Sequence, residues 1–523
     1  MISCRQVSKG SACRYYLKDV VVGDMHRPPG VALETAQDLA GVPQGQWLGR
    51  ALPWVGLVAD EAVTESEMMN LFGEGRHPHA EKVIADRLAE GDSPAKAERA
   101  ARLGYRVQKF TAIDLVFRPP GSIQILWALA DPHTRRVIET LHLQVLREVV
   151  TQEVEEKLLI VRVGKDSVRQ LARPGVMAAR FRHYTSRKDG PLLHDHVLIS
   201  VKVKRTDGGW GTLHTRTLLE HVVACSERYN QRILEEVCTR LGLATEPRFP
   251  TAGQRPVMEI AGIPEELINW AASRNQAIME RLGTLEELWV QRTGGPVSVK
   301  VRRRLMAMAA DETRPAKDRA RPLSQWLAKW RAAAIALVGR AVVDNLLRLA
   351  RAAARVIRGR TVAVLDVAAG ALEITATVSE YYPGGFRRRH LLAEARRHLT
   401  RVFRGRPVPA GADEALVDAA MGAHCVDSSP PRALDLPPQV VDYRRLMPRW
   451  APVPDTETAR GGVEAAWIYY RARAEAVRRT SDGRRETASV RRSRVGRAAP
   501  PAGEGQDLRE RQAGPESGRN RKL

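Results

Sequence analysis

The 523-residue chain carries 83 lysines and arginines against 60 aspartates and glutamates, which gives a formal net charge of +23. A hydrophobic content of 44% predicts a folded body of about two to four domains, and the basic excess favours a polyanionic partner, nucleic acid above all. No apolar run approaches the roughly 20 residues of a membrane span, no signal segment opens the chain, and five scattered cysteines argue against disulfides or a thiolate zinc site. We therefore expect a cytoplasmic protein without membrane insertion.

The first 24 residues contain an adjacent tyrosine pair, Tyr15 and Tyr16, followed by a β-rich valine run. Adjacent tyrosines are most often packing residues, so this pair gains a functional meaning only in combination with other residues. From residue 28 to about 106, serine or threonine starts, periodic apolar positions and glycine stops predict a layer of helices.

Residues 110–117 alternate in a strand pattern that places Asp114 on the face opposite the large apolar side chains. A carboxylate in such a run lies either at a sheet edge or at a chemical site. Asp131 and Pro132 then provide the N-cap and first position of a helix. Residues 156–168 predict another strand, whose Gly-Lys step lacks the remaining features of a P-loop, so no nucleotide-hydrolysing motor is expected.

The strongest functional signal lies in residues 181–201. His194 and His196 belong to an apolar, β-rich run after a Gly-Pro break, which predicts a strand. Because strand side chains alternate between faces, both imidazoles project to one side and Asp195 to the other. A turn-rich link can bring His183 of the preceding segment alongside them. Three neutral imidazoles on one face predict a metal site with open positions, which can hold a substrate phosphate.

The second half of the chain predicts helices on one side of the sheet and a basic extension. Residues 202–214 predict a hairpin and residues 217–242 a long amphipathic helix, which completes an α+β fold. Between residues 300 and 358 there are 15 lysines or arginines and 4 acidic residues, on helical segments that can clamp a phosphate backbone. Residues 360–450 predict a smaller helical unit, and the polar, basic residues 471–523 predict a disordered tail.

Metal-holding histidines, a strand carboxylate and N-terminal tyrosines together suggest phosphoryl transfer to a tyrosine. A phenol with a pKa of about 10 needs a base or a nearby cation, and Asp114 can orient or deprotonate it. The metal would polarise the scissile phosphate. We expect Mg²⁺ or Mn²⁺ in use, with Zn²⁺ as the alternative that imidazoles bind more tightly. No organic cofactor is expected.

The chain resembles the TrwC/TraI-type conjugative relaxases of the HUH endonuclease superfamily, especially actinobacterial members, over residues 1–340 and weakly to about 450. The resemblance is carried by RYYLKD at 14–19, GQWLGR at 45–50, IDLVFRPPGSIQILWALADP at 113–132, FRHYTSRKDGPLLHDHV at 181–197 and DGGWGTLHTRTLLEH at 207–221. It implies a five-stranded antiparallel HUH sheet, ferredoxin- or RRM-like, with helical fingers that wrap DNA. It also implies a nick in single-stranded or hairpin DNA at an origin of transfer, through a 5′-phosphotyrosine on Tyr15.

In that family the strand aspartate corresponds to Asp114 and the metal ligands to His183, His194 and His196. DNA contacts are expected from side chains near this site and on the basic helices: Arg118, Ser122, Arg180, Arg182, Arg187, Arg302 and Arg303. The expected organisation is a relaxase domain over 1–340, divided into a catalytic palm to about 245 and basic helical fingers from 246. A small helical region over 341–455 resembles the segment that precedes a helicase.

Three departures from the family pattern leave alternatives open. Many relatives carry a second tyrosine pair, a lysine where this chain has Gly121, and a helicase after the relaxase. We expect a stand-alone relaxase or a truncated relaxase-helicase, with a separate helicase, accessory DNA-binding proteins and a coupling ATPase as candidate partners. The alternatives are a decayed relaxase that only binds origin DNA, a rolling-circle replication initiator of the HUH class, and a three-histidine zinc hydrolase; the +23 charge argues against the last.

Overall fold

The computed structural model describes residues 1–9, 30–104, 109–163, 168–250, 255–315, 322–382, 385–428 and 441–450. At its centre is a five-stranded sheet in which all neighbours are antiparallel. The strand order is β1 (Ile2–Ser8), β3 (Phe110–Phe117), β7 (Pro191–Ser200), β6 (Ala178–Thr185) and β2 (Gln46–Leu48). The expected five-stranded antiparallel sheet is confirmed.

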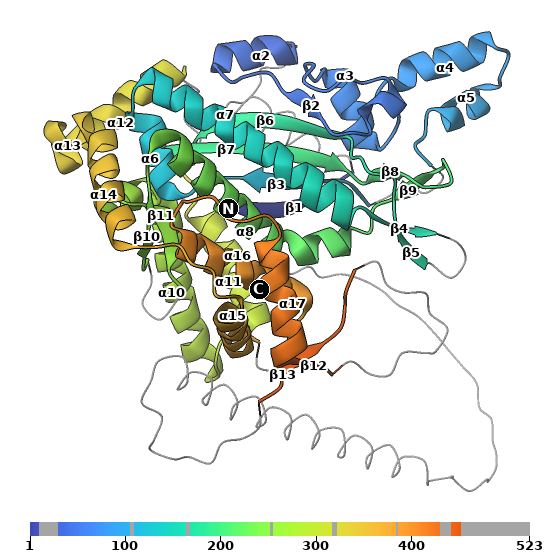
Figure 1. The fold of residues 1–523 in the computed structure, drawn as a ribbon. Coiled ribbons are helices and arrows are strands. Elements are labelled where there is room, and N and C mark those ends of the chain that lie inside the picture. Colours follow the sequence, from blue (N-terminus) through green and yellow to red (C-terminus); the bar gives the residue numbers. More distant parts are fainter. Residues whose placement is uncertain are drawn as a thin grey trace, which may run out of the picture.

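One face of the sheet is covered by a main helical layer (Figure 1). The layer consists of α6 (Gly121–Leu129), α7 (Pro132–Val149), the π-helical segment η4 (Val150–Leu158) and α8 (Thr215–Leu241). Alternate side chains of β3 and β7, such as Leu115, Phe117 and Val197, pack into its core. Asp131 caps α7 by accepting hydrogen bonds from backbone N–H groups at 2.9 and 3.0 Å, and α8 ends at Gly242 with φ 71°, both as predicted.

A smaller core lies on the opposite face of the sheet, where residues 30–104 pack. This part contains α2 (Leu33–Ala40), η2 (Leu52–Val55), α3 (Glu65–Met68), η3 (Met69–Glu74), α4 (Ala80–Ala89) and α5 (Pro94–Ala100). Its buried residues Leu71 and Phe72 belong to one cluster with Phe181 and Leu198 of the sheet. The expected helical layer is therefore present, and it covers the sheet around Leu198 of β7.

Two short hairpins flank the sheet: β4 (Ile160–Val163) with β5 (Val168–Leu171), and β8 (Lys202–Lys204) with β9 (Trp210–Thr212). A third, β10 (Thr245–Arg248) with β11 (Val257–Ile260), leads from α8 into the helical extension. The helices that follow are α9 (Glu265–Ala271), α10 (Ser273–Thr293), α11 (Val299–Glu312), α12 (Leu323–Val338), α13 (Arg340–Asp344) and α14 (Leu346–Arg360). Helices α10 and α11 pack around their own small apolar cluster. Trp330, Val343 and Leu346 return to the main core, so the packing continues across the boundary expected at residue 340.

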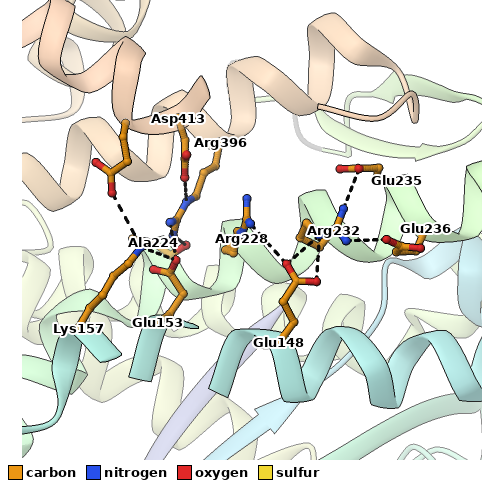
Figure 2. Close-up of polar contacts among 11 residues, drawn as sticks. Glu148, Glu153, Lys157, Ala224, Arg228, Arg232, Glu235, Glu236, Arg396 and Asp413 are labelled. Atoms are coloured by element: carbon orange, nitrogen blue, oxygen red, sulfur yellow. Dashed lines mark hydrogen bonds and ion pairs between the residues drawn. The ribbon is translucent and has the colours of Figure 1, made fainter. Parts of the chain in front are cut away.

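The C-terminal helices pack on α8, and one buried guanidinium group lies at the centre of this contact (Figure 2). They are α15 (Val367–Tyr381), α16 (Arg388–Phe403) and α17 (Ala412–His424). The hairpin of β12 (Cys425–Asp427) and β13 (Leu446–Pro448) follows them in the chain. Arg396 of α16, 1% exposed, donates to Glu153 Oε1 at 2.8 Å, to Asp413 Oδ2 at 2.9 Å and to the carbonyl of Ala224 at 2.8 Å. Its partners come from η4, α17 and α8, so this side chain ties the C-terminal helices to the main helical layer.

Acid is expected to loosen this contact. Burial alone would raise the pKa of Glu153, but Arg396 and Lys157 hold that pKa below its ordinary value, and Arg396 does the same for the buried Asp413. Such carboxylates stabilise the fold above their unfolded pKa of about 4, and this contribution is lost as pH falls through the lowered folded values. We expect calorimetric Tm to fall between about pH 5 and pH 2 more steeply than in a Glu153→Gln/Asp413→Asn variant. Equal slopes in the two proteins would contradict this account.

None of the described helices is both long and apolar enough to cross a membrane. The tail expected over 471–523 lies outside the described residues.

Candidate metal centre

Strands β6 and β7 bring three histidines together on the sheet face opposite the main helical layer. His183 and His194 are direct register partners, and His196 lies two residues further along β7. The ring centroids are 5.1 to 5.3 Å apart, and each ring offers a nitrogen that lies within 4.8 Å of the corresponding nitrogens of the other two. The sequence predicted this convergence, and its geometry is that of a three-imidazole metal site.

The hydrogen bonds of two of these rings suit metal binding. Nδ1 of His194 lies 2.8 Å from the carbonyl oxygen of Leu192, and Nδ1 of His196 lies 2.8 Å from Oδ2 of Asp114. A ring nitrogen that donates to oxygen carries the proton, so Nε2 keeps its lone pair for a cation. Burial, and then the neighbouring His196, lower the pKa of His194 to about 3, which keeps this ring neutral at physiological pH. The donor set therefore fits a divalent cation and leaves coordination positions open.

Asp114 supports the site from the adjacent strand β3. The side chain is buried, and its two carboxylate oxygens lie 2.8 and 3.1 Å from Nδ1 of His196. Asp114 lies on the face opposite the large apolar side chains of β3, as predicted, and the histidines lie on that same face. Its contact, however, is with a histidine of the metal site, so its evident role is to orient that ring. Tyr15 and Tyr16 lie outside the described residues, and a direct action of Asp114 on a tyrosine stays a prediction.

Replacing Asp114 by asparagine is expected to weaken metal binding by about 10- to 100-fold, because the amide cannot fix the ring of His196 as a carboxylate does. Mn²⁺ affinity measured by calorimetry would show the change. Asp86→Asn, an exposed aspartate on α4, is the matched control and should bind Mn²⁺ like the wild type. Equal Mn²⁺ affinities for all three proteins would show that Asp114 does not support metal binding.

The other face of the same strands carries a buried ionic cluster centred on Asp195. This carboxylate accepts hydrogen bonds from Arg180 at 2.9 Å and from Arg182 at 2.9 and 3.1 Å, beneath the main helical layer. Burial would raise its pKa, but Arg182 and His142 hold the pKa of Asp195 well below its usual range. DNA contacts by Arg180 and Arg182, expected from the sequence, are therefore wrong: only 8% and 9% of these residues is exposed, and their guanidinium groups serve the core.

Ser122 and Gly121 also have structural roles. Ser122 is fully buried, and its hydroxyl donates to Glu259 Oε2 at 2.6 Å and accepts from the backbone N–H of Ile260 at 2.7 Å. The expected DNA contact at Ser122 is wrong, because this hydroxyl fixes α6 to β11. At Gly121 an added Cβ would lie 2.9 Å from Cγ2 of Ile268, so α9 packs closely against this position.

A cavity of about 1020 Å³ includes the three histidines in its wall. Two of the predicted DNA-contacting residues, Arg118 and Arg187, also line it. Arg118 donates to Ser3 Oγ at 3.0 Å, and burial lowers the pKa of its guanidinium while the charge of Asp114 opposes that effect. Arg302 and Arg303 are exposed on α11 and do not belong to the cavity lining.

The sequence analysis missed several other cationic residues of the cavity. Arg248 and Arg255 come from the β10–β11 hairpin and Arg274 from α10. Each lies in an ordinary polar stretch of the chain, and only the folded arrangement brings them toward the histidines. No local pattern distinguishes them from other surface arginines.

Comparison with known proteins identifies the family. The family model described as TrwC relaxase matches residues 9–337. Two relatives from Escherichia coli, both called multifunctional conjugation protein TraI, are 28% identical over 219 and 297 residues, which are 40% and 54% of this chain. The chain spans only 12% and 14% of the length of these two relatives. Structures of the conjugative relaxase TrwC with OriT DNA, metal-free and metal-bound, match 64% of this chain and 98% of theirs, with 20% identity and TM-scores of 0.43. Because the family model covers more than half of its length, the chain belongs to the TrwC relaxase family.

Proposed function

We propose that this protein is a conjugative relaxase, a site- and strand-specific transesterase that nicks single-stranded DNA at an origin of transfer and rejoins it. One observation carries the proposal: three imidazoles, one of them oriented by Asp114, converge on the wall of a large cavity in a chain of the TrwC relaxase family. The chain matches only a small part of the TraI relatives, so the proposal concerns strand cleavage and joining alone.

The proposed reaction exchanges one phosphodiester bond for another. The hydroxyl oxygen of Tyr15 forms a bond to phosphorus and its proton passes to a base, while the bond from phosphorus to the 3′ oxygen breaks. The 3′ oxygen takes up a proton, from this base or from water, and leaves as a hydroxyl. The phosphotyrosine bond retains the energy needed for rejoining, which fits the absence of a P-loop motif in the sequence.

The residues around the cavity are assigned to binding and orientation. His183, His194 and His196 would hold a divalent cation, which when bound neutralises developing charge on the scissile phosphate. Mg²⁺ or Mn²⁺ is the proposed working ion. Arg118 and Arg187 line the same cavity, and we assign them to the flanking phosphates, contacts that position the strand without reading its sequence.

The test is the covalent adduct. Labelled single-stranded fragments of the protein's own genetic element are incubated with the protein and Mn²⁺ and resolved on a denaturing gel. We expect a protein–DNA adduct with the wild type and with Tyr16→Phe, and none with Tyr15→Phe or His194→Ala, because nucleophile and metal ligand are both required.

An adduct that persists when both tyrosines are replaced would contradict the proposed nucleophile. Tight, salt-sensitive binding without any adduct would instead identify an origin-binding protein that has lost catalysis. If the cognate site supports plasmid copying and not transfer, the same chemistry serves a rolling-circle initiator.

A further inference from the structure

The cavity extends beyond the part of the chain that matches the family model. Its wall includes Glu373 and Thr377 of α15 and Arg397, His398 and Arg401 of α16, all of which follow residue 337, where the match ends. The buried contacts of Arg396 hold α16 against α8 (Figure 2). The C-terminal helices therefore form one part of the cavity wall, and the three histidines lie in another part of it.

Two neighbouring tyrosines lie at the C-terminal end of α15 with much of their surface exposed. Tyr381 is 45% exposed and Tyr382 is 41% exposed. The guanidinium group of Arg255, a residue of the cavity wall, lies 3.7 Å from the ring centroid of Tyr381. The ring of His390 stacks on Tyr382 with centroids 4.1 Å apart and planes 9° apart. Each tyrosine ring thus has a planar partner, and each residue keeps a large part of its surface exposed.

Several arginines lie around this pair. Burial, and then the neighbouring charges of Arg389 and Arg387, lower the pKa of His390 to about 4. Arg255 and Arg389 also lie near Tyr382. Among the described residues, Arg255 forms an ion pair with Glu394 at 3.0 Å and Arg389 forms one with Glu220 at 3.5 Å. Three guanidinium groups therefore lie near the two rings, together with the two paired carboxylates and Glu380, which directly precedes Tyr381 in the chain.

We propose that Tyr381 and Tyr382 form a base-stacking platform for single-stranded DNA, next to Arg255 of the cavity wall. Bases of any sequence stack on aromatic rings, and flanking arginines take the phosphates, so exposed rings set among guanidinium groups suit an unpaired strand. The inference that the bound strand is the one that is nicked rests on the proposed function. Binding to the platform requires neither cleavage nor a metal ion.

The first measurement is the affinity for fluorescein-labelled oligo(dT) of about 30 nucleotides, by fluorescence anisotropy without divalent metal. Tyr381→Ala/Tyr382→Ala is expected to raise Kd by about tenfold, because base–aromatic stacking is lost. Tyr381→Phe/Tyr382→Phe keeps both rings and should retain wild-type affinity, which separates stacking from any chemistry at the hydroxyl groups. An unchanged Kd in the alanine variant overturns the platform.

A second measurement uses the wild-type protein alone, so it does not depend on how a variant folds. Oligo(dT) carrying 5-iododeoxyuridine is photo-crosslinked and the modified peptide mapped by mass spectrometry. Cross-links at Tyr381 or Tyr382 support the platform, and cross-links confined to other segments overturn it. The two proposals fail separately. If the nicking assay gives no adduct, the oligo(dT) affinities can still be measured and compared. If the alanine variant binds oligo(dT) like the wild type, adduct formation is unaffected.

Discussion

Replacing Asp195 by alanine is expected to destabilise the protein by about 3–5 kcal/mol, although this residue lies between two histidines of the metal site. Asp195 has no exposed surface, and it is the shared acceptor for Arg180 and Arg182 at 2.9 to 3.1 Å. Without it, two buried guanidinium groups lose their main counter-ion beneath α7, and the cost of removing their charges from water is no longer offset.

Denaturant unfolding followed by circular dichroism measures this loss. Glu90→Ala is the control, because Glu90 pairs with Arg87 at 3.0 Å on an exposed surface, where such a pair contributes about 1 kcal/mol or less. A similar loss of stability in both variants would show that the Asp195 cluster has no special weight in the core.

Replacing Arg396 by alanine is expected to cost a comparable amount, about 3–5 kcal/mol, and to weaken the docking of the C-terminal helices. The substitution removes the guanidinium group that Glu153 and Asp413 share and leaves the carbonyl of Ala224 without this donor. Two carboxylates would then remain largely buried, with Lys157 near one of them.

Hydrogen exchange across α16 and denaturant unfolding together test this expectation. We expect faster exchange in α16 and a lower unfolding midpoint, while Arg360→Ala, an exposed arginine at the end of α14, should change stability by no more than about 0.5 kcal/mol. If Arg396→Ala matches this control, the buried ionic cluster does not hold the C-terminal helices in place.

Local rules were sufficient for the parts of the fold that depend on neighbouring residues. The alternation of a strand separated the histidines from Asp195, and the N-cap at Asp131 and the C-terminal stop at Gly242 follow from local hydrogen bonding. Strand β2 escaped notice because its three residues form a strand only by pairing with β6.

The errors at the candidate site have two physical origins. Arg180 and Arg182 lie three and one residues before His183, so the alternation that identified the histidine face already places both arginines on the other side. The basic flank was read as one surface although a strand has two. Ser122, in contrast, bonds to Glu259 across 137 residues, and Arg396 to Glu153 across 243. No local pattern can indicate such partners.

The different residues on the two faces of β7 also favour the correct register of the β6–β7 hairpin. A slip of β7 by one residue against β6 would exchange its two faces. Two ligand histidines would then turn toward Arg180 and Arg182 under α7, and a carboxylate would take their place beside His183. The misregistered hairpin would lose two metal ligands and its buried counter-ion in a single step. Metal binding and core packing therefore select the same strand register, so a misaligned intermediate is stabilised by neither of them.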